Sequence, residues 1–157
     1  MSTVEQHSQE PQWLTVPQLR AWRELTFLMG QLPTVLDAQL KRDAGLSYLE
    51  YYVMAGLTEQ PNHEMRLSDL ASRSSAELSR LSHLISRLER RGFVRRMTDG
   101  DDRRFTRAVM TEAGLAHMAE AAPAHVEEVR GLVFDVLDDS EVEVLRSCVE
   151  KINKQLR

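Results

Sequence analysis

Apolar residues recur at steps of three and four along residues 78–90, and this period predicts one amphipathic helix. Its apolar stripe consists of Leu78, Leu81, Leu84, Ile85 and Leu88. At about 100° per residue, the opposite arc is cationic and rich in small hydrogen-bonding side chains. That arc consists of Ser79, Arg80, Ser82, His83, Ser86, Arg87 and Arg90. Such a face suits a helix that enters the major groove of DNA.

The segments around this helix predict a winged helix-turn-helix. A short helix precedes it, with Ser68 as the expected N-cap, and the turn between the two lacks the glycine often found there. Gly92 ends the longer helix. Two strands, 93–97 and 104–110, follow around an Asp-Gly turn, and residues 64–67 are a candidate edge strand that pairs with this hairpin.

A long amphipathic helix is predicted ahead of this unit, from Pro17 to about Gly45. Pro33 lies inside it and is expected to kink or break it, because proline removes one backbone hydrogen bond. Ser47 and Glu50 form a capping box for a second helix. A helix of more than about 20 residues is long for so small a domain. We therefore expect the first helix to pack across a partner subunit.

Further amphipathic helices follow the hairpin. One opens at Thr111 and continues past Pro123, and Asp138 or Asp139 caps a last helix. Cys148 lies on the apolar side of that last helix, so we expect it to be buried and inert. The predicted fold class is mainly α with a small β-wing. In this fold a winged helix-turn-helix is flanked by N- and C-terminal dimerisation helices.

The charge of the chain is unevenly placed, although its formal net charge is −4. Residues 66–107 contain 11 arginines and six acidic residues, a balance of +5, so the rest of the chain has a balance of −9. A basic centre in an acidic frame fits a DNA-reading module on a scaffold that does not bind DNA. The alternative is that these arginines form an ordinary solvated face.

Length, composition and motifs exclude several other classes. A chain of 157 residues folds without needing a disulfide or a metal, and its lone cysteine favours the cytoplasm. No apolar run reaches the roughly 18 residues of a membrane span, so no membrane partner is expected. The sequence has no nucleophile elbow, phosphate-binding glycine loop, CxxC or HExxH motif. We expect neither an enzyme nor a metal or cofactor site.

Two sequence motifs, taken with this order of predicted elements, resemble those of a known protein family. Residues 88–96 read Leu-Glu-Arg-Arg-Gly-Phe-Val-Arg-Arg, and the wing carries Asp102-Arg103-Arg104 followed by Met110-Thr111. From about residue 16 to residue 157, the chain resembles the MarR family (multiple antibiotic resistance regulators), whose wing ends on Leu-Thr. The resemblance implies a homodimer whose first and last helices interlock, with one winged helix on each half of a palindromic operator in double-stranded DNA. Many members are repressors released by small aromatic or phenolic ligands.

On the long helix, the side chains expected nearest the bases are Ser79, Arg80, Ser82 and His83. Arg87 is expected to contact a phosphate or to pair with an acidic neighbour. The alternative is that these polar residues simply solvate an exposed face.

At the wing, Arg103 and Arg104 lie just past the turn, where arginine suits a narrow minor groove. Asp102 cannot favourably face a phosphate, so we expect it to pair with Arg96 or Arg104 and stabilise the wing. The alternative is an ordinary charged hairpin.

The family also suggests a ligand pocket in the crevice between the dimerisation and DNA-binding parts. The candidates on elements that border it are Trp22, Tyr51, Tyr52 and His63. An aromatic side chain on an amphipathic helix is more often part of the core, which is the alternative for each of them.

We expect residues 1–15 to form a flexible arm and residues 16–157 to form a single domain. Within it, residues 46–111 are the expected DNA-binding part, and residues 16–45 and 112–157 are the expected dimerisation helices. A protein-interaction module that keeps the winged-helix shape without binding DNA is the competing class. The arginine-rich arc and the wing motif favour the DNA-binding protein, because a module that had lost DNA would be expected to lose those charges.

Overall fold

The computed structural model describes residues 11–99 and 102–156, and from residue 99 to residue 105 it describes no side chains. The chain divides into two compact units, Met1–Thr34 and Val35–Arg157. Helix α1 (Val16–Ala44) begins in the first unit and continues into the second. Pro33 lies inside α1, and the helix is not interrupted there, so the predicted break is wrong.

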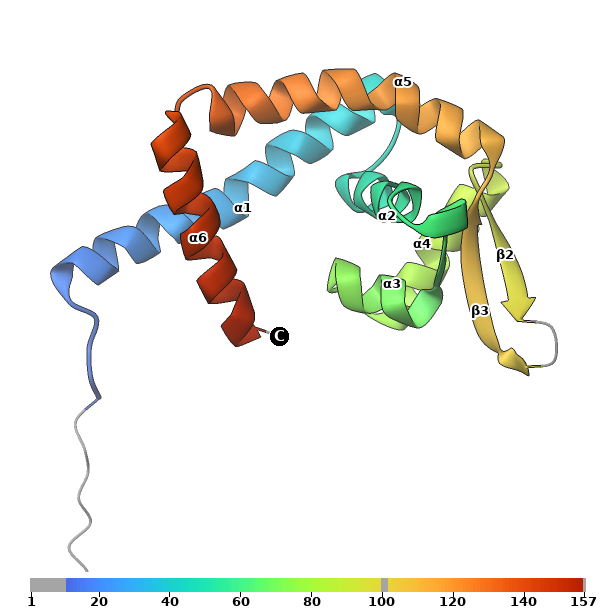
Figure 1. Cartoon of the computed structure of the whole chain (residues 1–157), viewed down its shortest axis with the longest axis horizontal. Coiled ribbons are helices and arrows are strands. Elements are labelled where there is room, and N and C mark those ends of the chain that lie inside the picture. The colour runs from blue at the N-terminus through green and yellow to red at the C-terminus, as the bar shows by residue number, and fades with distance from the viewer. Residues whose placement is uncertain (1–10, 100–101, 157) are drawn as a thin grey trace, which may run out of the picture. The chain divides into compact units, whose positions relative to one another are not determined.

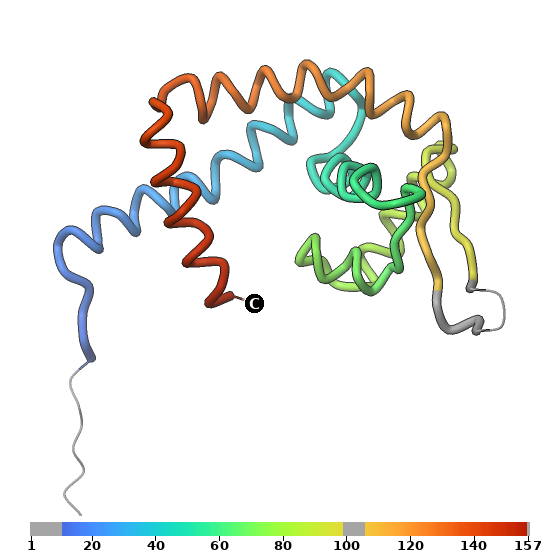
Figure 2. The backbone as a smooth tube through the Cα atoms, in the orientation of Figure 1, coloured from blue at the N-terminus to red at the C-terminus, as the bar shows by residue number. Residues whose placement is uncertain are grey.

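The second unit holds the remaining elements, and Figure 1 labels helices α2 to α6 and strands β2 and β3 among them. Its helices are α2 (Tyr48–Thr58), the short 3-10 helix η1 (Pro61–His63), α3 (Leu67–Ser74), α4 (Leu78–Arg90), α5 (Glu112–Val129), the π-helical segment η2 (Arg130–Phe134) and α6 (Asp139–Leu156). Its strands are β1 (Glu64–Arg66), β2 (Val94–Asp99) and β3 (Asp102–Met110). This order confirms the mainly helical class with a small β-wing. Figure 2 follows α5 past Pro123 and into η2 without a break in the backbone coil.

The three strands form one antiparallel sheet in the order β1-β3-β2 (Figure 1). Glu64 of β1 lies opposite Val109, which confirms the predicted edge strand. On the other side of β3, Val94 of β2 lies opposite Met110. The register of the hairpin shifts between Thr98 and Asp99, close to its turn. The wing is therefore a β-hairpin that β1 extends on one side.

The core of the second unit lies between α2, α3, α4, the sheet and α5. From α4 it receives Leu81, Leu84, Ile85 and Leu88, each at most 1% exposed. Full burial of each such side chain contributes about 1.5–3 kcal/mol, so these four hold the helix in place with about 6–12 kcal/mol in total. Leu78 departs from the prediction, because it begins the helix at the edge of the apolar stripe and is 55% exposed.

The helix ends follow the sequence signals with one exception. Ser47 Oγ accepts from the backbone nitrogen of Glu50 at 3.2 Å, and Ser47 donates its own nitrogen to Glu50 Oε2 at 2.8 Å, which confirms the capping box. Gly92 has a φ of +78°, as the end of α4 requires. The expected N-cap at Ser68 is wrong, because β1 runs directly into α3 and Arg66 occupies the cap position.

The turn between α3 and α4 contains a serine in the conformation that a glycine often adopts there. Ser75 ends α3 with a φ of +51° and a ψ of +31°, which is the left-handed conformation that glycine adopts most easily. Its backbone nitrogen donates to Ser72 O, and the next nitrogen, that of Ala76, donates to Ala71 O at 3.1 Å. These bonds satisfy the last carbonyls of α3, so the turn forms without glycine.

Helix α6 has no buried residue in the single chain. Val144, Leu145, Val149 and Ile152 are all exposed, and Cys148 is exposed with them. The predicted burial of Cys148 is therefore wrong for one chain, because none of the residues described in the second unit covers the apolar stripe on which it lies. None of the described helices is both long and apolar enough to span a lipid bilayer.

Candidate nucleic-acid interface

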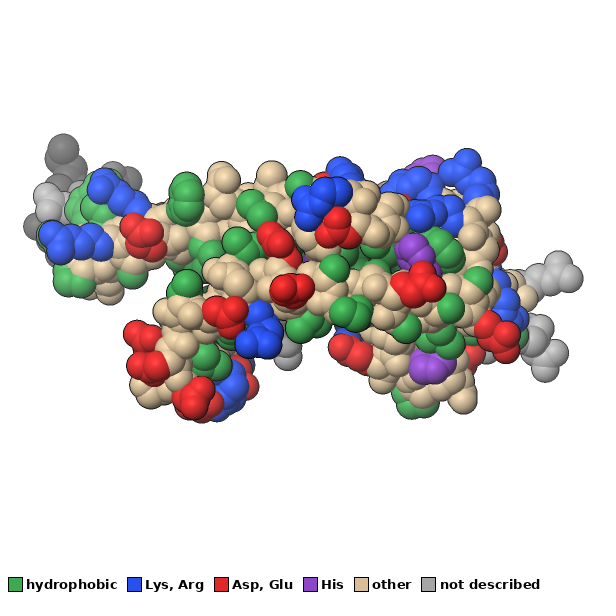
Figure 3. All heavy atoms as spheres, turned by 90° about the horizontal axis from the view of Figure 1, so that it is seen from above, with side chains coloured by type: hydrophobic (Ala, Val, Ile, Leu, Met, Phe, Trp, Pro, Cys, Tyr) green, Lys and Arg blue, Asp and Glu red, His purple; other side chains and the backbone are tan. Residues whose placement is uncertain are grey.

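Helix α4 turns a polar face to solvent opposite its buried stripe. Ser79, Arg80, His83, Arg87 and Arg90 are all exposed on it. In Figure 3, Lys and Arg side chains gather at the end of the view that holds the winged-helix elements. The structure thus brings the four exposed residues predicted to contact DNA from this helix onto one accessible cationic surface, together with Arg90.

Arg96 of β2 connects the wing to this helix. Its Nη2 donates to Ser82 O at 2.7 Å, to Ser82 Oγ at 3.1 Å and to Ser86 Oγ at 3.0 Å. Its Nη1 donates to Glu89 Oε2 at 2.8 Å, and the other carboxylate oxygen of Glu89 accepts from the backbone nitrogen of Arg96. One guanidinium thereby holds three residues of α4, and we call this set the Arg96 clamp.

The Arg96 clamp changes the expectation for Ser82. This serine is half-buried, and both its carbonyl and its hydroxyl oxygen already accept from Arg96. A hydroxyl can still donate while it accepts, so a contact to DNA stays a prediction. Among the four candidates for base contacts, however, Ser82 also has a structural role, which is to dock the wing.

Arg87 connects the other flank of α4 to α2. Its Nε donates to Glu50 Oε1 at 3.1 Å, and Glu50 is only 7% exposed. Burial raises the pKa of the Glu50 carboxyl, but hydrogen bonds from Ser47 and Arg87 outweigh it, so the pKa lies below its ordinary value. Glu50 is therefore charged at neutral pH, and it both completes the capping box of α2 and pairs with Arg87 of α4. Of the two predicted roles of Arg87, the structure shows the pairing with an acidic residue.

The tip of the wing lies largely outside the described side chains. The backbone of Asp102, Arg103 and Arg104 begins β3, with Asp102 opposite Asp99, but nothing is described of these side chains. The predicted minor-groove contacts of Arg103 and Arg104, and the predicted pairing of Asp102, remain predictions. Arg96 does join the wing to Glu89 and the serines of α4 by hydrogen bonds, and the stabilisation of the wing expected from it stays a prediction.

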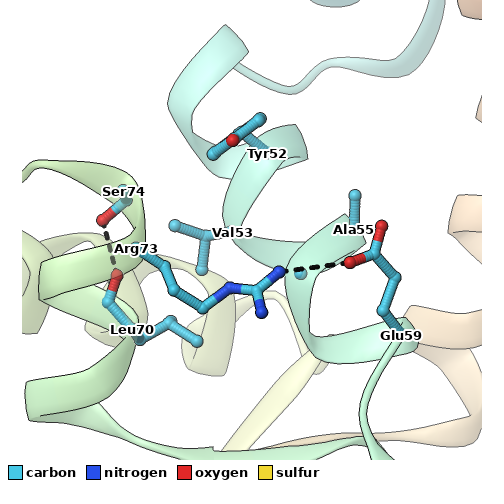
Figure 4. A pocket seen from close by; sticks show the side chains of 8 residues that line it. Tyr52, Val53, Ala55, Glu59, Leu70, Arg73 and Ser74 are labelled. Carbon is cyan, nitrogen blue, oxygen red and sulfur yellow. Dashed lines mark hydrogen bonds and ion pairs between the residues drawn. The ribbon is translucent and has the colours of Figure 1, made fainter. Parts of the chain in front are cut away.

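One of the candidates for ligand binding lines a groove in the second unit. A groove between α2 and α3 is shown in Figure 4, where Tyr52 lies at one end and Arg73 crosses the apolar floor towards Glu59, with Nη2 3.1 Å from Oε2. Tyr51 and His63 do not line this groove. Trp22 lies in the first unit and is 50% exposed.

Tyr51 belongs instead to a polar cluster inside the second unit. The centroid of its ring lies 4.3 Å from the centroid of the His125 ring in α5. His125 Nδ1 donates to Gln39 Oε1 at 3.0 Å, and Gln39, which is 2% exposed, donates to Asp43 Oδ2 at 2.9 Å. Burial lowers the pKa of His125, although Glu128 opposes the shift. His63 is half-buried, with its Nδ1 3.0 Å from Thr58 O.

The described residues contain no group of three or more His, Cys, Asp or Glu side chains that could hold a metal ion. Helix α4 thus presents hydrogen-bond donors and positive charge, and it is attached to its surroundings by the core, the Arg96 clamp and the Arg87–Glu50 pair. It suits recognition of a polyanion with base edges in a groove.

Comparison with known proteins agrees with this surface. A model of the MarR family matches residues 46–106. The chain is 35% identical to Sco3205, a MarR family transcriptional regulator from Streptomyces coelicolor whose crystal structure is a complex with DNA; the match covers 94% of this chain and 92% of that one, with a TM-score of 0.90. The chain belongs to the MarR family. This confirms the resemblance drawn from residues 88–96 and from the wing.

Two other relatives support the same assignment. AbsC, another MarR family transcriptional regulator from Streptomyces coelicolor, is 36% identical over 94% of this chain and 99% of that one, with a TM-score of 0.87. The HTH-type transcriptional repressor YetL of Bacillus subtilis is 24% identical over 112 residues, which cover 69% of this chain and 67% of YetL. This MarR family member is a DNA-binding transcriptional regulator, and these relatives are regulators rather than enzymes.

Sequence reasoning missed three residues of this MarR surface. The sequence predicted only a helix-capping role for Glu50, a pairing with Arg87 or Arg90 for Glu89, and a place in the core for Leu78. The signal for Glu89 was present, since it and Arg96 lie in the same quoted motif. The partner of Glu50 lies 37 residues away in sequence, so no local pattern indicated it.

Proposed function

We propose that this regulator is a homodimeric repressor that binds a palindromic operator and releases it when a small ligand binds. The observation that carries the proposal is the exposed cationic face of α4, which the Arg96 clamp and the Arg87–Glu50 pair hold in a fixed position. A rigid helix with Ser79, Arg80 and His83 outward is suited to reading bases in the major groove.

The dimer is supported by apolar surface that a single chain leaves exposed. In the second unit, α6 exposes Val144, Leu145, Val149 and Ile152 along one stripe. The first unit exposes Leu19, Trp22, Phe27, Leu28 and Met29 on α1. Apolar stripes of this length are typical of interfaces. We propose residues 16–45 and 112–157 as dimerisation helices, 46–111 as the DNA-binding part and 1–15 as a flexible arm.

The proposed contacts divide by role. Ser79, Arg80, Ser82 and His83 face bases, and Arg87 exchanges between Glu50 and a phosphate. Arg103 and Arg104 enter the minor groove beside the half-site, where arginine is attracted to the negative potential. Asp102 stabilises the wing by pairing with Arg96 or Arg104.

Release follows from a shift in population between two forms of the dimer. Two recognition helices match successive major grooves only when the half-sites are about 34–36 Å apart. A small aromatic or phenolic ligand that binds preferentially to a dimer with a different separation of its recognition helices lowers the fraction of dimers that can bind the operator. Tyr51, Tyr52 and His63 are the proposed ligand contacts in the second unit, where Tyr52 lines a groove, and Trp22 is the candidate in the first unit.

A mobility-shift titration against the DNA that flanks the coding sequence tests the proposal at two salt concentrations. The wild type is expected to bind one fragment in the presence of excess random DNA and to weaken as salt rises. Arg80→Ala should relax the preference at particular bases, at a cost of about 1–3 kcal/mol. Arg146→Ala is the matched control, because it removes the same charge from an exposed site on α6, and sedimentation must show that this variant still forms the dimer.

The remaining parts of the proposal have separate readouts. Sedimentation should give twice the mass of one chain, and simple phenols and benzoates should be screened for release of bound DNA. A wild type that binds no DNA at either salt concentration would favour the protein-interaction module. Equal losses in Arg80→Ala and Arg146→Ala would show that α4 does not read bases.

A further inference from the structure

The end of helix α1 is bonded to two elements that lie far along the chain. The last carbonyls of a helix have no partner inside it. His117 of α5 donates from Nε2 to Ala44 O, in the last residue of α1, at 2.9 Å. Arg91, which directly follows α4, donates from Nη1 to Gly45 O at 2.8 Å. Its positive charge also suits the negative end of the helix dipole of α1.

The ring of Phe93 contacts both of these donors. Its centroid lies 4.8 Å from Cζ of Arg91 and 4.5 Å from the centroid of the His117 ring, and the two rings are inclined by only 15°. The backbone of Phe93 is also held, because its nitrogen donates to Leu88 O in α4 and its carbonyl accepts from Thr111 N just before α5. We call Arg91, Phe93 and His117 the α1 clasp.

The α1 clasp joins the recognition helix directly to the end of α1. The bond from Arg91 to Gly45 O connects the residue after α4 with the residue after α1. Gly45 has a φ of +62°, and a Cβ added there would lie 3.5 Å from Nη2 of Arg91, so the guanidinium also packs against this turn. Asp37 Oδ1 of α1 accepts from Tyr48 N at the start of α2 at 2.8 Å. The end of α1 is thereby attached to α2, α4 and α5.

The separation of two recognition helices in a dimer depends on how each one is attached to the helices that hold the dimer together. We propose that Arg91 and His117 are positioning residues that fix the direction of α4 against α1 and thereby set the half-site spacing that the dimer accepts. Neither residue needs to contact a base for this role. This inference rests on the proposed homodimer and palindromic operator.

The size of the effect is bounded by the bonds of the α1 clasp. One added base pair moves a half-site by about 3.4 Å along the DNA, so the dimer reaches both half-sites only if an attachment of α4 gives way. The hydrogen bond from the charged, exposed Arg91 changes such an equilibrium about tenfold, and the neutral one from His117 about fivefold. A variant without one of these bonds no longer has to break it, so its penalty for altered spacing falls by that factor.

The experiment uses the full-length protein and an operator obtained by in vitro selection with the wild type. Palindromes are built with the selected spacing and with one base pair added or removed, and a dissociation constant is measured for each. The wild type should bind the altered spacings at least about tenfold more weakly than the selected one. Arg91→Ala should reduce this ratio about tenfold, and His117→Ala should reduce it about fivefold.

The ratio between spacings distinguishes positioning from a general loss of stability or of one phosphate contact, because either loss weakens binding at every spacing alike. Arg95→Ala is the matched control, since it removes the same charge from an exposed site on the neighbouring strand β2 and should keep the wild-type ratio. Arg91→Lys keeps the charge and a donor but not the planar guanidinium, so it should recover part of the spacing preference.

Three results would overturn the inference. A wild type that prefers one spacing, with the same preference in Arg91→Ala and His117→Ala, would refute it and leave the proposed function standing. Equal relaxation in Arg95→Ala would show that charge beside the wing, and not the α1 clasp, sets the spacing. A wild type that binds a single half-site as tightly as the palindrome would overturn both this inference and the proposed dimeric function. If one alanine variant fails to fold, the other decides.

Discussion

Replacing Arg96 with alanine should separate the wing from the recognition helix. The side chain of Arg96 makes four hydrogen bonds to α4, one of them to the carboxylate of Glu89, and it is 27% exposed. The substitution leaves the carbonyl and hydroxyl oxygens of Ser82 and the carboxylate of Glu89 without this donor.

The magnitude can be worked from those bonds. A hydrogen bond that involves a charged group contributes about 1.5–3 kcal/mol, but contributions at one guanidinium are not additive. Glu89 is 39% exposed, so water screens the ion pair and replaces part of it. We expect the free energy of unfolding to fall by about 2–3 kcal/mol. For a chain of this size, that lowers the melting temperature by about 4–12 °C.

The DNA readout distinguishes a loose wing from a weaker fold. A total stability of about 5–15 kcal/mol leaves the variant almost entirely folded at 25 °C. A loss of DNA affinity in the variant at 25 °C would therefore come from an altered position of the wing and not from unfolding. This loss should be larger for a specific binding site than for random DNA. Arg96→Lys keeps the charge but not the planar fork, so it should recover only part of the stability.

The matched control for stability is Arg95→Ala, because Arg95 is the exposed neighbour of Arg96 on β2 and points to the opposite face of the strand. Thermal melts of the wild type and the three variants give the comparison. The reasoning is refuted if Arg96→Ala loses no more stability than Arg95→Ala, or if its selectivity for the selected site is unchanged.

Two further variants test the packing and the polar cluster by thermal melts. Gly114→Ala should lower the free energy of unfolding by more than about 2 kcal/mol, because an added Cβ would lie 2.1 Å from Phe93 O. Its control is Gly56→Ala, which has open space around the added Cβ and should be neutral or stabilise the fold by up to about 1 kcal/mol. Equal melting temperatures of the two variants would contradict this prediction. Burial lowers the pKa of His125, so between that lowered value and the ordinary value of about 6.5 the unfolded chain binds more protons. The contribution of neutral His125 to the free energy of unfolding should be fully present above about pH 6.5 and should be lost as the pH falls below that value. In His125→Gln, the free energy of unfolding should depend less on pH in this range. An unchanged pH dependence would show that other groups cause the loss.

Most helices and strands of this fold could be predicted from local sequence patterns. The 3- and 4-residue period of α4 predicted its four buried residues, and the Ser47–Glu50 spacing predicted a cap that the structure shows. These signals work because each depends on residues within one or two turns. Ser68 failed for a related reason, since the start of α3 is set by the pairing of Arg66 in the sheet and not by a serine near the helix.

The candidate site was readable only in part. Residue types on α4 indicated a cationic face, but the partners that fix the face come from elsewhere: Arg96 lies 14 residues beyond Ser82, and Glu50 lies 37 residues before Arg87. Such contacts depend on how helices and strands pack, which spacing does not encode. Cys148 shows the same limit, because burial on an amphipathic stripe requires something to cover it, and one chain does not supply the cover.

The two sets of contacts on α4 together define which residues are free to meet DNA. The wing side of the helix is occupied by the Arg96 clamp at Ser82, Ser86 and Glu89, and the α2 side is engaged at Arg87. The exposed residues outside these contacts are Ser79, Arg80 and His83 near the start of the helix, and Arg90 near its end. Since the N-terminal residues of such a helix contact the bases, we expect the first three to read sequence and Arg90 to contact a phosphate. Substituting Ser79 or His83 should therefore change sequence preference, whereas Arg90→Ala should weaken binding to all sequences and lower its salt dependence.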